Sequence, residues 1–156
     1  MLDLHTAPPD DPATWVLLDG LTREEADGLV PPRGALLVLV DGSETVAGGA
    51  IGPIDEGVGE IKRMWTAPTH RGNGYGRLVL AALERQAFEL GYRLLRLKTG
   101  TAAGPALALY RSAGYRLAPP FDRYPLAVEF EKWLVSDAEG QIPVHDRFEA
   151  RPDVAA

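Results

Sequence analysis

The sequence of 156 residues contains no cysteine. This absence excludes disulfide bonds, thiolate metal sites and a cysteine nucleophile. Histidine is also scarce, and His5, His70 and His145 are too far apart in the sequence to pair at metal-ligand spacing. We therefore expect no metal site.

Long apolar runs are missing as well. The longest wholly apolar run is Ala35–Val40, whereas a membrane-spanning helix needs about 20 apolar residues. The N-terminal segment MLDLHTAPPDD has no basic stretch followed by an apolar one, so it does not look like a signal peptide. We expect a cytoplasmic protein with no membrane partner.

Positive charge is the third deficit. The chain has 16 Lys and Arg residues against 22 Asp and Glu residues, which leaves a net charge of −6. Nucleic-acid binding needs clustered Lys and Arg, so nucleic acid is not an expected partner. An acidic surface suits a cationic or neutral substrate, and it also serves solubility alone. The apolar content of 46% is ordinary for a globular protein, and the length predicts a single domain.

The periodicity of the sequence predicts helices and strands that alternate along most of the chain. A helix that crosses over between two strands places those strands parallel, which predicts an α/β fold with a mixed sheet. The predicted elements are two short helices within 10–30, strands at 35–42, 45–54 and 58–68, a helix at 77–92, a strand at 92–100, a helix at 104–114 and a strand at 126–135.

Two of these elements carry more detailed predictions. In the strand at 58–68, strict alternation places Glu60, Lys62, Met64 and Thr66 on one face and Ile61, Arg63 and Trp65 on the other. In the following helix, the apolar stripe consists of Val79, Ala82, Leu83, Ala87 and Leu90, and Gly91 is the expected C-terminal stop.

The stretch RGNGYG, Arg71–Gly76, joins that strand to that helix and has three glycines at alternate positions. Glycine loses more entropy on folding than any other residue, so three of them need a reason. A glycine-rich curl at a helix N-terminus lets several backbone N–H groups point into one concavity, where the helix dipole favours an anion. The loop therefore predicts a site for phosphate or pyrophosphate.

Two common nucleotide-binding motifs do not fit this loop. A P-loop requires a Lys-Ser/Thr pair, and the helix here starts with Arg77 and Leu78. A dinucleotide fingerprint requires a third glycine at position 77 and an acidic residue after the next strand, which instead ends near Lys98.

The pattern Arg71, Gly74 and Gly76 resembles the acetyl-CoA signature Arg-x-x-Gly-x-Gly of the GNAT superfamily of N-acetyltransferases. The stretches EIKRMWTAPTHRGNGYGRLVL and LKTGTAAGPALALYRSAGY are similar to two consecutive parts of that family, in the same order. The likeness covers roughly Leu2–Val135. It implies a mixed, mostly antiparallel central sheet flanked by helices, with strands four and five splayed apart. Residues 1–135 would form this domain, and 136–156 a polar C-terminal extension, either packed on a partner or flexible.

The resemblance also implies roles for individual residues, with acetyl-CoA as the co-substrate. Glu60 matches the general base of several members, and Tyr110 matches the usual general acid. The alternatives are that Glu60 only pairs with Lys62, and that Tyr110 is a core aromatic with its hydroxyl bonded to the backbone. The residues expected to bind the cofactor are Met64, Trp65, Thr66, Arg71, Gly72, Asn73, Gly74, Tyr75, Gly76 and Arg77.

The acceptor side is less defined. Trp65, Phe121 and Tyr124 are candidates to line its pocket, and Trp65 fits core packing equally well. Arg63 and Lys62 either steer an acidic acceptor or are simply solvated. Ala103 stands where the family often has Asn, which concerns one polar contact to the cofactor.

The function implied by the resemblance is acetyl transfer to a primary amine, in a small molecule or a protein. Because no cysteine is present, direct attack in a ternary complex is favoured over an acyl-enzyme. The alternatives are a non-catalytic module that senses acyl-CoA, and a nucleotide-dependent oxidoreductase. A homodimer is common in the family.

Overall fold

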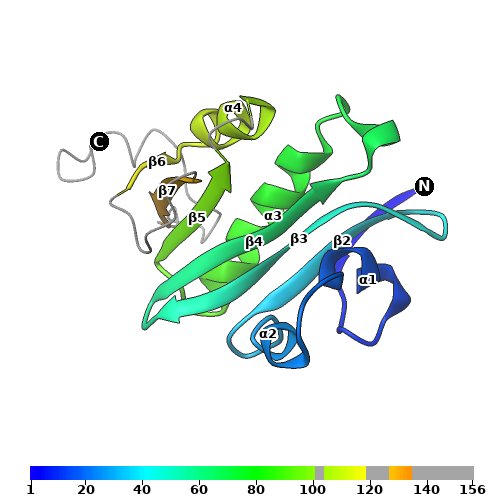
Figure 1. Cartoon of the computed structure of the whole chain (residues 1–156), viewed down its shortest axis with the longest axis horizontal. Helices are drawn as coiled ribbons and strands as arrows, with labels where there is room; N and C mark the ends of the chain where they lie inside the picture. Colours follow the sequence, from blue (N-terminus) through cyan, green and yellow to red (C-terminus); the bar gives the residue numbers. More distant parts are fainter. Residues whose placement is uncertain (101–103, 119–126, 135–156) are drawn as a thin grey trace.

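The computed structural model describes residues 1–100, 104–118 and 127–134. Seven strands form a sheet in the order β1-β2-β3-β4-β5-β7-β6 (Figure 1). The strands are β1 (Leu2–Thr6), β2 (Ala35–Asp41), β3 (Glu44–Asp55), β4 (Val58–Thr66), β5 (Leu94–Gly100), β6 (Arg116–Leu117) and β7 (Ala127–Trp133). The helices are α1 (Trp15–Leu18), α2 (Arg23–Asp27), α3 (Tyr75–Glu89) and α4 (Gly104–Ser112), with short 3₁₀ turns at Pro12–Thr14 and Pro68–His70.

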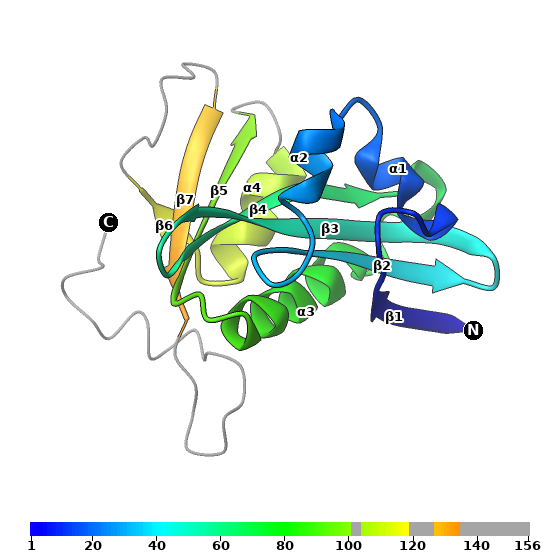
Figure 2. The ribbon, with the colours of Figure 1, turned by 90° about the horizontal axis from the view of Figure 1, so that it is seen from below.

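The pairing confirms the predicted fold class. Neighbouring strands are antiparallel except β4 and β5, which are parallel and are joined by the crossover helix α3. Helix α3 covers one face of the sheet, and α1 and α2 cover the opposite face (Figure 2). Among the described helices, none is long and apolar enough to cross a membrane.

The short N-terminal helices form where the sequence provides caps for them. The Asp11 side chain accepts a hydrogen bond from the backbone N of Ala13 at 2.9 Å. At α2, the backbone N of Glu25 donates to the Thr22 hydroxyl, and the Glu25 carboxylate accepts from the backbone N of Thr22. This capping box satisfies two amide groups that have no partner inside the helix, so a helix of only five residues can form.

Strand β1 was not predicted. Its register pairs Leu4 with Leu39 and His5 with Val38, which adds an edge to the sheet beside β2. The segment LDLHT does alternate apolar and polar residues, but its five residues are too few to separate a strand from an extended N-terminus. Strand β6 was missed for the same reason, because it has only two residues.

Helix α3 buries the predicted stripe with two differences. Val79, Leu83 and Ala87 are fully buried, whereas Ala82 and Leu90 are only partly buried. Leu80 and the charged Glu84 are buried too. The helix ends as predicted, with Gly91 at φ +101°, a conformation that costs glycine little because it has no Cβ.

Glu84 belongs to a buried polar network on the α3 face of the sheet. Its carboxylate accepts hydrogen bonds from the Lys132 ammonium at 3.0 Å and from the Tyr115 hydroxyl at 2.8 Å. Lys132 also donates to the carbonyl of Ala113 at 2.8 Å. Burial raises the pKa of the Glu84 carboxyl, and the Lys132 charge opposes that increase. The network therefore surrounds a buried carboxyl with two hydrogen-bond donors and links α3 to β7.

Lys132→Met should lower the free energy of unfolding by about 3–5 kcal/mol, because it leaves the Glu84 carboxylate buried without its cation. Without Lys132 the pKa of Glu84 rises further in the folded state. The loss should therefore be largest at neutral pH and shrink as the pH falls toward 4.5, the ordinary pKa of this carboxyl. Urea unfolding across pH measures this. The double variant Glu84→Gln, Lys132→Met is the control and should regain most of the loss; equal loss in both variants would contradict the interpretation.

Candidate active site

The site begins where β4 and β5 stop pairing. Their parallel register runs from Val58 opposite Leu94 to Ile61 opposite Leu97. β4 then continues to Thr66 and β5 to Gly100 without further pairing to each other. The two strands are therefore splayed, as predicted, and backbone groups of β4 face the opening.

A β-bulge in β4 lies at the start of this opening. Lys62 pairs with Ala50, and the next paired residue, Trp65, lies opposite Gly48, so Arg63 and Met64 share the position opposite Gly49. Arg63 has φ +59°, which is rare for a residue other than glycine. Bulges of this kind bend a strand and re-aim its side chains.

The bulge makes the predicted alternation of β4 wrong beyond Lys62. Glu60 and Lys62 share a face as expected, but Met64 packs into the core on the α3 side, whereas Trp65 packs with Leu17 on the α1 side. The extra residue shifts the period-two pattern by one position, so every following side chain changes face. Sequence alternation alone contains no signal for this shift.

The Arg63 guanidinium connects the bulge to helix α1. Its Nε donates to the carbonyl of Leu17 at 2.7 Å, and its Nη2 donates to the carbonyl of Asp19. Carbonyls at the end of a helix have no partner inside the helix, and a cation there is favoured by the helix dipole. Arg63 therefore holds the end of α1 against the open part of β4, a role that sequence analysis left undecided between steering and solvation.

The glycine loop contains two residues with left-handed backbone conformation. Gly72 and Gly74 have φ of +83° and +79°, and Gly74 is the N-cap residue of α3 without a side-chain cap. The first amides of α3 consequently have no partner within the helix. The Asn73 side chain donates to the carbonyl of His70 at 2.9 Å and closes the loop on itself.

Gly76 packs closely against α4. A Cβ at this position would lie 3.3 Å from Cδ2 of Leu109 in α4. The Arg77 guanidinium donates to the Ser112 hydroxyl at 2.7 Å, which is another link from α3 to α4. Arg71 is exposed, and the His70 and Tyr75 rings stack with centroids 6.4 Å apart.

These elements enclose a cavity of about 1040 Å³. It extends from the end of α1 along the open part of β4 to the glycine loop and α4. Most of the predicted cofactor-binding residues line it, and Asn73 does not. The lining includes Val16, Leu17, Asp19, Ile61, Lys62, Arg63, Met64, Trp65, Thr66, His70, Arg71, Gly72, Gly74, Tyr75, Gly76, Arg77, Lys98, Thr99, Pro105, Ala106, Leu109 and Tyr110.

Tyr110 lies in the wall of the cavity. Only 5% of it is exposed, and its ring packs edge-on against Tyr115 and tilted against Phe130, with centroids 5.9 and 6.3 Å away. Burial raises the pKa of its hydroxyl to about 12. Within the described residues this hydroxyl has no hydrogen-bond partner, in contrast to the alternative that it is tied to the backbone. Tyr110 is thus both a core aromatic and a protonated group beside the opening.

Glu60 lies next to the cavity but not in its lining. It is 9% exposed and its carboxylate is 3.5 Å from the Lys62 ammonium. Lys62 does line the cavity. The structure therefore brings Tyr110 and the glycine loop to one cavity, and Glu60 lies outside its lining, beside Lys62.

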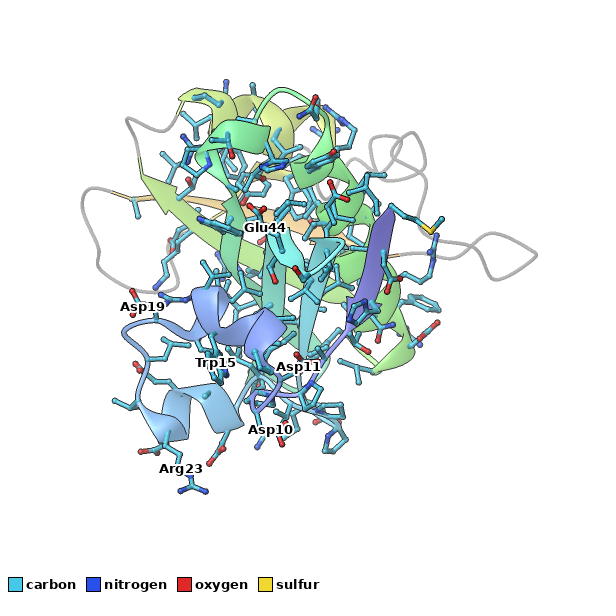
Figure 3. The ribbon with its side chains drawn as sticks, turned by 90° about the vertical axis from the view of Figure 1, so that its right-hand side faces the viewer. Asp10, Asp11, Trp15, Asp19, Arg23 and Glu44 are labelled. Carbon is cyan, nitrogen blue, oxygen red and sulfur yellow. The ribbon has the colours of Figure 1, made fainter. Side chains whose placement is uncertain are left out.

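Two tryptophans of this region differ in their exposure. Trp65 is partly buried against Leu17 and also lines the cavity, so it packs in the core and touches the site. Trp15, on α1, is 61% exposed and lies near Asp10 and Asp11, while Asp19 lies at the other end of the helix (Figure 3).

Three sequence-based expectations fall outside the described residues. They concern Ala103, the aromatic pair Phe121 and Tyr124, and the C-terminal extension 136–156.

The sequence matches the profile of the acetyltransferase (GNAT) family over residues 3–115, and the chain belongs to this family. It is 42% identical over 110 residues to an "IAA acetyltransferase" of Azospirillum brasilense, a match that covers 68% of this chain and 72% of the relative.

Solved structures agree with the family assignment. A protein described as an acyl-CoA N-acyltransferase from Klebsiella pneumoniae is 34% identical with a TM-score of 0.73, covering 85% of this chain and 97% of its own. A GNAT family acetyltransferase from Elizabethkingia anophelis, solved with acetyl-CoA bound, has the same fold with a TM-score of 0.68 at 22% identity, covering 85% of this chain and 98% of its own.

Replacement of Arg63 should separate backbone strain from the hydrogen bonds of its side chain. Both Arg63→Ala and Arg63→Gly remove the bonds to α1, but only glycine relieves the positive φ, a difference of about 1 kcal/mol. Urea unfolding should therefore show Arg63→Gly to be more stable than Arg63→Ala, the reverse of the usual order within a strand. The usual order would show that the bulge is not retained.

Gly74→Ala should weaken coenzyme A binding, because a Cβ disfavours the left-handed conformation that turns the loop amides inward. The cost in stability should be about 1 kcal/mol. Gly57→Ala is a matched control, since Gly57 has φ +73° and equally open surroundings in the β3–β4 turn. Calorimetry with coenzyme A should show weaker binding for Gly74→Ala alone; equal affinities in both variants would contradict the assignment.

Proposed function

We propose that this protein transfers an acetyl group from acetyl-CoA to a primary amine by direct attack in a ternary complex. The observation that supports this most is the continuity of one cavity, which joins the left-handed glycine loop, the opening between β4 and β5, and Tyr110. An anion site, an open strand edge and a buried proton donor are three of the features that this reaction uses.

The glycine loop is suited to the pyrophosphate. The amides of Gly72–Arg77 would bind its oxygens, with Arg71 at the rim, because the first turn of α3 offers unpaired N–H groups and the positive end of its dipole. The backbone of Met64, Trp65 and Thr66 would pair with the amides of the pantetheine arm. A main-chain N–H there would also polarise the thioester carbonyl, which is worth roughly 3 kcal/mol.

The acceptor enters as an ammonium and loses one proton, and its nitrogen then attacks the thioester carbon. The C–N bond forms and the C–S bond breaks, and the sulfur takes a proton from the Tyr110 hydroxyl. A second proton lost from the nitrogen restores Tyr110. Overall, acetyl-CoA and an ammonium give an amide, coenzyme A and one released proton.

The environment of Tyr110 matches this role. Because burial raises its pKa to about 12, the hydroxyl keeps its proton at every pH at which the protein would work. Its ring is held by Tyr115 and Phe130, so the hydroxyl is positioned without a hydrogen bond of its own to the described residues.

Glu60 is proposed as the base for the first proton, acting through water. Its carboxylate is 3.5 Å from the Lys62 ammonium and lies outside the cavity lining, so we propose a water-mediated path rather than direct contact. Because Glu60 pairs with Lys62 outside the cavity lining, its position also favours an alternative function, a non-catalytic module that binds acyl-CoA. The alternative predicts coenzyme A binding without release of thiol in the presence of any amine.

Tyr110→Phe should lower kcat by about 10²–10⁴-fold and leave the affinity for coenzyme A unchanged, because it removes only the proton donor. The pH profile provides a second check. The rate should rise as the amine loses its proton and should show no decline up to at least pH 10, since burial raises the pKa of the Tyr110 hydroxyl to about 12. Thiol release measures both. Equal rates in the two proteins, or a decline between pH 8 and 10, would remove the assignment.

We propose that residues 1–135 form the acetyltransferase domain, that the chain assembles as a homodimer, and that it works in the cytoplasm. Light scattering of the purified full chain tests the oligomeric state.

A further inference from the structure

Charged side chains form ordered rows on the face of the sheet covered by α1 and α2. One row crosses four strands in register, with Glu60 opposite Arg96, Arg96 opposite Glu131, and Glu131 opposite Arg116. The Nε of Arg96 is 3.7 Å from the Glu131 carboxylate. The signs alternate along this row, which is the arrangement that stabilises directly opposed pairs in a sheet.

The next row on the same face does not alternate. On the β7 side, Lys98 lies opposite Glu129. On the β4 side, across the opening, the next charged residue of the row is Lys62. Both lysines come one residue after the last β4–β5 pair, Ile61 and Leu97. They are thus at equivalent positions on either side of the opening, with no strand between them in the described sheet.

Both lysines face away from α3. Ile61 and Leu97 pack in the core with α3, so the residues that follow them point to the other face. Lys62 Cε is 3.9 Å from the position that a Cβ of Gly52 would take, and Leu29, which follows α2, borders the same position. Both lysines line the cavity.

The charge of this part of the cavity is unusual for the chain. The sequence has only three lysines among its 16 cationic residues. Lys132 is buried with Glu84 on the α3 face, and the other two are the ones that flank the opening. The neighbouring cation, Arg63, donates its hydrogen bonds to carbonyls of Leu17 and Asp19. Among the described residues, the acid beside Lys62 is Glu60, and the acid in the cavity lining is Asp19.

We propose that Lys62 and Lys98 bind a carboxylate of the acceptor, so the acceptor is an amine that also bears a carboxylate, such as a free amino acid. This inference rests on the proposed acetyl transfer. Two like charges across an opening repel each other, and an anion between them restores the alternation of the preceding row. The same pair disfavours polyamines, whose second ammonium would meet it.

The test compares matched acceptors with acetyl-CoA while released thiol is monitored. Each pair consists of an amino acid and the amine that lacks its carboxylate, for example phenylalanine with phenethylamine and leucine with 3-methylbutylamine. For every pair that reacts, the member with the α-carboxylate should have a kcat/KM about tenfold higher or more.

Variants at Lys62 link this preference to the site. Lys62→Met should lower kcat/KM for the α-carboxylate member about tenfold through KM, and Lys62→Arg should restore part of it. The KM for acetyl-CoA should not change. Lys62 also pairs with Glu60, so its replacement could slow the reaction by disturbing the proposed base. That effect would lower kcat/KM equally for the amino acid and for the matching amine. Loss of carboxylate binding would instead lower kcat/KM for the amino acid alone. Arg85→Met, which removes an exposed charge of α3 outside the cavity lining, is the matched control.

Three results would overturn the inference. Equal or faster reaction of the amines without an α-carboxylate would show that the substrate class is wrong, while acetyl transfer itself stands. A preference for succinyl-CoA over acetyl-CoA that Lys62→Met abolishes would place the anion on the acyl chain instead. If the protein binds coenzyme A and acetylates no amine of either set, the proposed function fails and this inference fails with it.

Discussion

The end of pairing between β4 and β5 is the constraint on which the site depends. Up to Ile61 and Leu97 the two strands satisfy each other's backbone groups, and beyond that point a strand edge lies open in the middle of the sheet. An open edge there exposes unsatisfied N–H and C=O groups. The bulge at Arg63 bends β4 at this point, and the guanidinium of the same residue bonds to the end of α1. The same residue thus lies at the bend of the strand and bonds to the helix that borders the cavity.

The two faces of the sheet divide the chemistry between them. The α3 face is apolar and closely packed, and its charged pair, Glu84 and Lys132, is enclosed with hydrogen bonds on both partners. The opposite face carries rows of charged side chains in register. Tyr110 belongs to the apolar core but reaches the cavity, which explains how a group with a pKa raised to about 12 is available beside the opening.

The glycine loop and the packing of α3 against α4 are parts of one arrangement. Left-handed φ values at Gly72 and Gly74 start the helix without a side-chain cap, which leaves its first amides for an anion. Gly76 and Arg77 meanwhile join α3 to α4, the helix that carries Tyr110. A change in the loop therefore affects the wall of the cavity as well as the anion site, and membership in the GNAT family is consistent with both features.

The sequence by itself determined the features that depend on local chemistry. The caps at Asp11 and Thr22, the stop at Gly91 and the left-handed glycine loop follow from residue types at fixed spacing, and the mixed sheet follows from the order of the elements. Only the tertiary structure decided the bulge at Arg63, the burial of Glu84 with Lys132, and the placement of Lys62 across from Lys98. These arise from register and packing between segments far apart in the chain, and a one-residue shift in register reverses every face that the sequence pattern predicts.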